Sequence, residues 1–216
     1  MKINRFLLSQ LVFALFLFLV FSGSVQAQTI NNPEQKISKS GIPYRPDNAQ
    51  AGPEDVVKAI RARRGGKLLN LDRMLLNSPA FAQAWNTMFG VIRGKLALSP
   101  KLRELAIMAV GAINKADYEW VSHTPDFLSA GGTKAQMEAL QDVSTAINNA
   151  QLFDESERAT LALTYEMTRN ITVAQSTMGR VRAILPDQQI IELVGTIAGY
   201  NMVSRFLIAT GIDSEE

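Results

Sequence analysis

Glu119 and His123 are the residues whose types and spacing best suit proton chemistry. They lie four positions apart in the stretch DYEWVSH at 117–123, and His123 is the only histidine of the chain. On a helix this spacing stacks two side chains on one face, with Cβ atoms about 6 Å apart. A carboxylate beside an imidazole orients the ring and lets the pair take up or deliver a proton near neutral pH. Such pairs are also common on helix surfaces, so spacing alone leaves a structural role open.

The segment that starts at Ser99 is predicted to be a central helix, buried on both sides. Its apolar residues follow the i, i+3, i+4, i+7 spacing of a packed face, and its opposite face is apolar too. Glu104 projects from this second face beside Ile107, Met108 and Gly111. A carboxylate with such neighbours has either a charged partner or a raised pKa.

Helix start and stop signals recur along the chain without a repeat of sequence, which favours a helical bundle. No segment alternates apolar and polar residues with period two between turn residues, so we predict an all-α fold. The signals are the serine-proline starts Ser78-Pro79 and Ser99-Pro100, the capping pairs Thr133/Gln136 and Asp154/Glu157, and a last helix from Pro186-Asp187 to about Thr210.

Residues 1–27 have the layout of a signal peptide. Lys2 and Arg5 precede an apolar run from Phe6 to Phe21, and small residues occupy the positions that a signal peptidase reads before a cut after Ala27. We therefore expect export, to the periplasm or outside the cell. An uncleaved anchor is the alternative, but the run is shorter than the roughly 20 residues of a spanning helix. No stable membrane association is expected after cleavage.

The composition of the mature chain limits which classes of partner we expect it to bind. Loss of Lys2 and Arg5 from 22 basic residues leaves 20 against 20 acidic ones. Without a net positive charge or a basic stripe with interleaved aromatic residues, nucleic acid is a poor candidate partner. The chain has no cysteine, which excludes disulfides, a lipid-modified N-terminus and thiol chemistry.

Residues 28–66 are predicted to be an N-terminal arm with a short helix, ahead of a helical domain at 67–216. The stretch from Gln28 to about Gly52 is polar and lacks apolar periodicity, so we expect it to lie outside the core. It would serve as a tether, or pack on a neighbouring subunit through residues 42–44.

The short helix of the arm is expected from Pro53 to Arg64, with Gly65-Gly66 as its end. Arg61, Arg63 and Arg64 lie in its last turns, and we interpret them as a solvated face.

Two segments of this chain carry a resemblance to a known family. One joins Arg103-Glu104-Leu105 to Tyr118-Glu119-Trp120-x-x-His123 and Gly131, and the other has Ile191-Glu192-Leu193-Val194, Tyr200-Asn201 and Arg205. Over roughly residues 68–212 the chain resembles the carboxymuconolactone decarboxylase family, which includes the alkyl hydroperoxidase D-like proteins. The resemblance implies an all-α multi-helix bundle that assembles as a homotrimer or homohexamer, with sites near subunit contacts.

The peroxidase chemistry of this family does not transfer to the chain. The active helix of the alkyl hydroperoxidase D-like proteins carries Cys-x-x-Cys followed by a histidine. In this sequence Ala116 and Glu119 stand at the two cysteine positions and His123 at the histidine. A thiol must be present to be oxidised by peroxide, so thiol peroxidase activity is excluded.

The resemblance instead implies the decarboxylase-like branch, in which a glutamate and a histidine act without metal or organic cofactor. The expected substrate is a small carboxylated lactone or keto acid, and the enzyme would be a lyase or isomerase. His123 is then the general acid/base, Glu119 its orienting partner or second proton carrier, and Glu104 holds the proton network.

Tyr118, Trp120 and Arg103 are further candidates for substrate contact. For the two aromatic residues we favour packing between helices, with their polar tips reaching the site. For Arg103 we favour a structural role, because adjacent helix positions face different ways.

Two other classes of function stay open. Glu104, Glu119 and His123 could bind a divalent metal ion with open positions, although the chain offers a single imidazole. A non-catalytic ligand-binding or assembly protein on the same bundle is the other class, because a fold alone does not fix a function.

Overall fold

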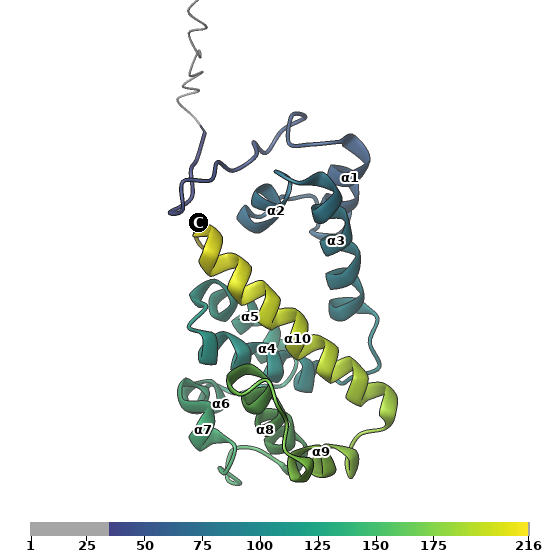
Figure 1. The fold of residues 1–216 in the computed structure, drawn as a ribbon, viewed down its shortest axis with the longest axis vertical. Coiled ribbons are helices and arrows are strands. Elements are labelled where there is room, and N and C mark those ends of the chain that lie inside the picture. Colours follow the sequence, from purple (N-terminus) through teal and green to yellow (C-terminus); the bar gives the residue numbers. More distant parts are fainter. Residues whose placement is uncertain (1–34, 216) are drawn as a thin grey trace, which may run out of the picture. The chain divides into compact units, whose positions relative to one another are not determined.

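This computed structural model describes residues 35–215 of the chain (Figure 1). All the regular secondary structure of these residues is helical. These residues contain no β-strand, only an isolated bridge between Ile37 and Pro43, so the all-α prediction is confirmed. The predicted leader lies outside the described residues. The helices are α1 (Glu54–Arg63), α2 (Asn70–Leu75), α3 (Pro79–Gly94), α4 (Pro100–Asn114), α5 (Asp117–Ser129), α6 (Lys134–Ala139), a 3-10 turn η1 (Leu140–Asp142), α7 (Val143–Ala146), α8 (Glu155–Arg169), α9 (Gln175–Arg182) and α10 (Asp187–Thr210).

Helix α4 is the centre of the bundle, as its two apolar faces predicted. It contacts α5, α8 and α10, and Figure 1 shows α10 crossing in front of it. Leu105, Ile107 and Met108, which point to different sides of α4, are all fully buried. An element covered on both sides can hold a charged side chain out of water, and Glu104 is such a side chain, with 1% of it exposed.

The predicted helix ends agree with the structure at most positions. Both capping boxes are present, at Thr133 before α6 and at Asp154 before α8, and α10 ends at Gly211 with φ of +61°. Ser99 accepts a hydrogen bond from the amide of Leu102. Ser78 makes no such bond at the start of α3.

The stretch at 35–52 contributes to the core, which corrects the prediction that it lies outside. Tyr44 and Ala51 are fully buried. The hydroxyl oxygen of Tyr44 accepts a hydrogen bond from the amide of Asp213, 2.9 Å away, and the guanidinium of Arg73 lies over its ring. Tyr44 thus anchors an otherwise polar segment to the core. The spacing of apolar residues in the sequence does not reveal this, because Tyr44 has no periodic apolar neighbours.

None of the helices in the described range combines the length and the apolar character that crossing a bilayer requires.

Candidate active site

His123 lies between two carboxylates. Its Nδ1 atom is 2.7 Å from Oε2 of Glu104 on α4, and its Nε2 atom is 3.6 Å from Oε2 of Glu119, one turn back on α5. At most 4% of each of the three side chains is exposed. The structure therefore brings together all three predicted catalytic residues, but Glu104 rather than Glu119 is the closer partner and orients the ring.

Helix α5 packs closely against α4 at Gly111. A Cβ atom at this position would lie 3.5 Å from Cβ of Glu119 and 3.6 Å from the amide nitrogen of Trp120, which is ordinary van der Waals contact, so an alanine would fit there. Lys115, in the left-handed region with φ of 55°, ends α4 and turns the chain into α5. Helix α5 then continues without interruption through Pro125.

The carboxylate of Glu104 is held in its ionised form. Burial on its own would raise the pKa of Glu104, but hydrogen bonds and charge interactions with His123 and Arg103 outweigh it and lower the pKa. An ionised carboxylate only accepts hydrogen bonds, so Nδ1 of His123 carries a hydrogen. The Nε2 atom of the ring is left facing Glu119.

Glu119 has the opposite electrostatic setting. Burial raises its pKa, and the nearby charges of His123 and Arg93 offset this only in part. Its Oε2 atom is buried without a hydrogen-bond partner in the described part of the chain. Two carboxyl groups whose pKa values are pushed apart beside one imidazole are typical of acid/base sites, in which one is charged and the other can give up a proton.

Glu119 and His123 line a cavity of about 520 Å³. One wall is aromatic, and it is formed by Trp85, Phe89, Tyr118 and Tyr200. The ring of Tyr200 meets the imidazole of His123 edge-on, with centroids 5.0 Å apart and planes at 87°. This contact helps to hold the imidazole in its orientation. The remaining lining residues are Arg63, Arg64, Leu69, Leu71, Gly90, Arg93, Gly94, Ser122 and Val203.

Two of the arginines predicted to form a solvated face turn inward instead. The side chains of Arg63 and Arg64 are 17% and 13% exposed, and both lie beside Asp72 of α2, which is itself 2% exposed. Arg61, which pairs with Asp47, is more exposed. The buried carboxylate of Asp72 is the physical reason, because it supplies the countercharge that lets guanidinium groups leave water.

The predicted substrate contacts divide into three cases. Tyr118 lines the cavity, and its hydroxyl donates a hydrogen bond to Glu215, 2.7 Å away. Trp120 packs against the core and does not line the cavity. The Nε atom of Arg103 donates to Oε1 of Glu104 at 3.1 Å, also outside the cavity lining, so Arg103 acts through Glu104.

Sequence reasoning missed Arg93 and Tyr200 as site residues. Trp85, Phe89 and Arg93 are spaced by four residues on α3, so an arginine that continues an aromatic stripe was a signal that it points inward. Arg93 forms an ion pair with Asp126 of α5. Tyr200 belongs to the segment of α10 that carried the family resemblance, although its ring contact with His123 could not be inferred from spacing.

A metal site is less well supported than an acid/base site. Among the described residues, the group that could bind an ion is Glu104, His123 and Asp126, not the predicted set with Glu119. Glu104 already pairs with Arg103, and Asp126 with Arg93. One imidazole and two carboxylates that already have cationic partners form a weak ligand set for a divalent ion.

Part of the sequence matches a known protein family. Residues 79–164, which run from the start of α3 into α8, match the carboxymuconolactone decarboxylase family. No protein of curated function matches the sequence.

Several solved structures share the fold at low sequence identity. An uncharacterised peroxidase-related protein from Silicibacter sp. TM1040 has a TM-score of 0.65 and 21% identity, covering 76% of this chain and 86% of its own. The alkylhydroperoxidase AhpD core protein from Ralstonia eutropha JMP134 gives 0.66 and 16%, covering 80% and 93%. The debrominase Bmp8 gives 0.62 and 16%, covering 75% and 85%.

The similarity to these structures establishes the fold of the chain. It does not show which substrate the chain binds. The resemblance inferred from the sequence is thereby confirmed: residues 79–164 match the carboxymuconolactone decarboxylase family, and the chain has the fold of the alkylhydroperoxidase D-like proteins.

Proposed function

We propose that this protein is a cofactor-free acid/base enzyme, in which His123 transfers a proton at a carbon atom of a small carboxylated lactone or keto acid. The observation that supports this best is the buried imidazole between an ionised Glu104 and a Glu119 whose pKa is raised, with both Glu119 and His123 lining one cavity. Proton transfer by a positioned side chain contributes about 10²- to 10⁴-fold to a rate.

In the proposed decarboxylation, the carbon–carbon bond to the substrate carboxylate breaks and carbon dioxide leaves. The electron pair stays on the substrate as an enolate-type anion conjugated with its carbonyl group. Nε2 of the protonated His123 then delivers a proton to that carbon, and the imidazole regains the proton from solvent. Glu104 stabilises the imidazolium, and the neutral carboxyl of Glu119 donates a hydrogen bond to the developing oxyanion. An isomerisation would use the same groups, with a proton removed and then returned.

The test is a panel of small carboxylated lactones and β-keto acids, incubated with the protein in D₂O. Carbon dioxide release, or deuterium at the adjacent carbon, is expected with the wild type and is expected to fall at least about 100-fold in His123→Gln. Ser122→Ala, at a cavity-lining position without an assigned role, is the matched control and should change the rate less than about twofold. Undiminished turnover in His123→Gln would refute the proposal, and an inactive panel would favour the binding alternative.

A metal-dependent enzyme is the second candidate, because one ligand atom each from Glu104, His123 and Asp126 lie within 4.8 Å of one another. Metal analysis of purified protein decides between the two. A stoichiometric divalent ion that is lost in Asp126→Asn would favour the metal enzyme, since Asp126 has no role in the proton transfer proposed above.

We also propose that the protein acts outside the cytoplasm, as the signal-peptide layout of residues 1–27 predicts. The intact mass of the protein recovered from the periplasm or medium of its host should correspond to a chain that begins at Gln28. Recovery of the uncut chain from membranes would support the anchor instead.

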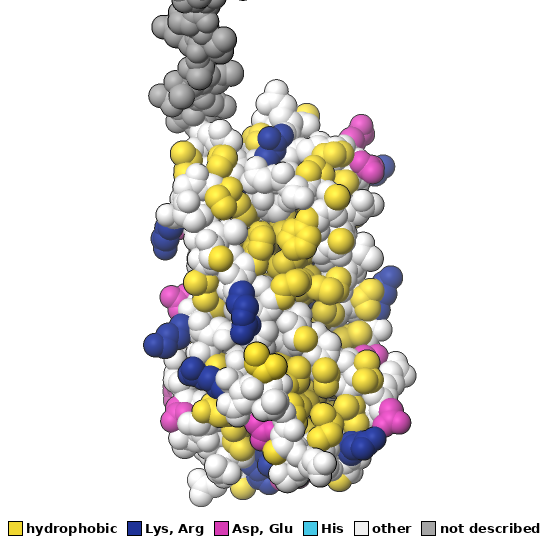
Figure 2. Space-filling model, viewed as in Figure 1, with side chains coloured by type: hydrophobic (Ala, Val, Ile, Leu, Met, Phe, Trp, Pro, Cys, Tyr) yellow, Lys and Arg dark blue, Asp and Glu magenta, His cyan; other side chains and the backbone are white. Residues whose placement is uncertain are grey.

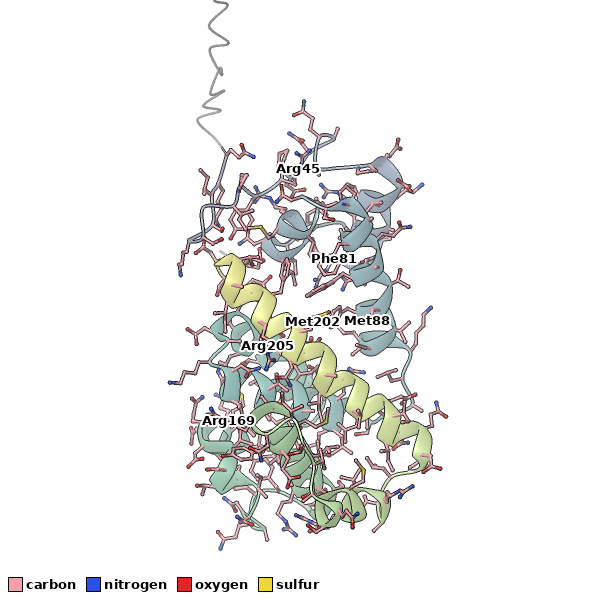
Figure 3. The ribbon with its side chains drawn as sticks, in the orientation of Figure 1. Arg45, Phe81, Met88, Arg169, Met202 and Arg205 are labelled. Atoms are coloured by element: carbon pink, nitrogen blue, oxygen red, sulfur yellow. The ribbon has the colours of Figure 1, made fainter. Side chains whose placement is uncertain are left out.

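The proposed homotrimer or homohexamer has a candidate contact surface along α3 and α10. Figure 2 shows hydrophobic side chains gathered over these helices, and Figure 3 shows Phe81 and Met88 of α3 near Met202 of α10. Phe81, Met88 and Met202 are each 37% to 43% exposed. Exposed apolar patches of this kind mark interaction sites. Light scattering should give the mass of an oligomer for the wild type and a smaller mass for Met202→Glu.

A further inference from the structure

We infer that Arg63, Arg64 and Arg93 form an anion-binding end of the cavity, and that Arg63 is the residue that selects a carboxylate on an otherwise flat, apolar ligand. The inference deepens the proposed function, because it assumes that the substrate occupies this cavity. Three guanidinium groups line the cavity, against a single lining carboxyl group, that of Glu119.

The local charges do not cancel at this end. Asp72 lies 3.0 Å from Arg64 and 3.6 Å from Arg63, so one carboxylate serves two guanidinium groups. Arg93 has its own partner in Asp126. Burial raises the pKa of Glu119, which favours the neutral form of this carboxyl group. The surplus positive charge therefore lies with Arg63 and Arg64.

Arg63 is the arginine with hydrogen-bonding capacity to spare. Its Nε atom donates to Asn86, while neither of its Nη atoms makes a hydrogen bond within the described residues. Arg64, by contrast, donates to Asp72 through both Nε and Nη2. The guanidinium fork matches the two oxygens of a carboxylate, which makes arginine the side chain best suited to bind one in two-point fashion.

The lowered pKa of Arg63 also supports its assignment as the arginine that binds a carboxylate. Burial, followed by repulsion from Arg64, lowers the pKa of Arg63 to about 10. A buried cation that is under-compensated gains most from an incoming anion, because the anion replaces both lost hydration and a missing countercharge.

The aromatic lining residues of the same cavity limit the shape of the ligand. Trp85, Phe89 and Tyr200 line the cavity, and the ring of Tyr200 contacts the imidazole of His123. A cavity of about 520 Å³ falls within the common range for small-molecule sites, roughly 300 to 1,000 Å³. A planar carboxylate held by Arg63 would therefore rest its body on the aromatic wall.

The anion-binding end draws on parts of the chain outside the family match. Arg63 and Arg64 come from the end of α1, and Asp72 comes from α2, all before residue 79. Only Arg93 lies in the matched range. The selectivity inferred here is thus a property of this chain and does not follow from the matched region.

The experiment compares benzoate with benzamide, a neutral molecule of the same shape, by calorimetry on the mature chain. Benzoate is expected to bind the wild type at least tenfold more tightly than benzamide. Arg63→Gln should lose that preference, whereas Arg61→Gln, on the same helix but facing solvent and paired with Asp47, should keep it. Equal binding of the two ligands by the wild type, or an unchanged preference in Arg63→Gln, overturns the inference.

One further variant keeps the test decisive. Arg63→Lys retains the charge and loses the fork, so it should weaken benzoate binding several-fold even if Arg63→Gln does not fold. Absence of turnover together with arginine-dependent benzoate binding would remove the proposed reaction and leave the anion site intact.

Discussion

The Nδ1 atom of His123 lies 2.7 Å from Oε2 of Glu104, although the two residues are nineteen positions apart and stand on different helices. This contact links α4 to α5 through a buried charge-assisted hydrogen bond. Because Arg103 binds the other oxygen of Glu104, the carboxylate has a partner on each side. The contact therefore stabilises the helix pair and fixes the orientation of the imidazole.

Glu104→Gln should destabilise the fold strongly. The substitution removes the negative charge that Arg103 and His123 share, and it puts an amide NH2 donor in place of one of the two oxygens that accept from them; breaking a buried charged pair costs about 3–5 kcal/mol. Urea unfolding at pH 7 measures this free energy. Glu138→Gln, at an exposed position on α6, is the matched control and should change the free energy of unfolding by less than about 0.5 kcal/mol. Similar midpoints for the two variants would contradict the assignment of Glu104 as a buried anchor.

Glu119→Gln should alter how stability depends on pH. Burial raises the pKa of Glu119 above its ordinary value of 4.5, so the folded protein holds this proton more tightly than the unfolded chain does. The stabilisation is complete below pH 4.5 and is lost as the pH rises through the raised pKa. The variant lacks this proton, so its stability relative to the wild type should increase with pH above 4.5. Parallel stability curves from pH 4 to 9 would mean that Glu119 is ionised in the folded protein.

Arg103→Met should impair catalysis without impairing substrate binding. Arg103 contacts Glu104 and does not line the cavity, so it positions the network and does not touch the substrate. With any substrate from the panel, kcat should fall about tenfold, the pH-rate profile should shift, and KM should change little. Arg169→Met, at an exposed position, is the control. A rise in KM with kcat unchanged would instead assign Arg103 to substrate binding.

Alanine substitutions at two glycines should have opposite effects on stability. A Cβ atom at Gly132 would overlap the ring of Phe127, which is fully buried on α5, so Gly132→Ala should cost about 1–3 kcal/mol. Gly179 is exposed on α9 with nothing within 4 Å of an added Cβ, so Gly179→Ala should stabilise by up to about 1 kcal/mol. Thermal unfolding of both variants tests this, and equal shifts would count against the packing assigned to Phe127.

Local features of this fold were readable from the sequence, and long-range ones were not. The helix boundaries and the Glu119–His123 pair depend on residues within one or two turns of each other, where proline, capping side chains and four-residue spacing act directly. The helix pattern predicted a buried Glu104, but its partnership with His123 came from the family resemblance, because no local rule brings position 104 to position 123.

The arginine end of the cavity shows the limit of local reasoning. Arg61, Arg63 and Arg64 look alike in sequence, but only Arg63 and Arg64 meet the buried carboxylate of Asp72. The direction in which these two arginine side chains point depends on the position of α2 in the fold, and the spacing of residues along the chain does not reveal that position. Tyr44 was missed for the same reason, since its partners lie near residues 73 and 213.

The origin of Arg63 in α1, ahead of the matched region, has a consequence for redesign. The groups proposed to move protons come from α4 and α5, whereas two of the three arginines come from the end of α1 and the residue that follows it. Libraries confined to residues 54–76 would thus alter which anion is accepted while leaving the imidazole and its two carboxyl partners unchanged. In natural descendants of such a chain, ligand preference would be free to diverge faster than reaction chemistry.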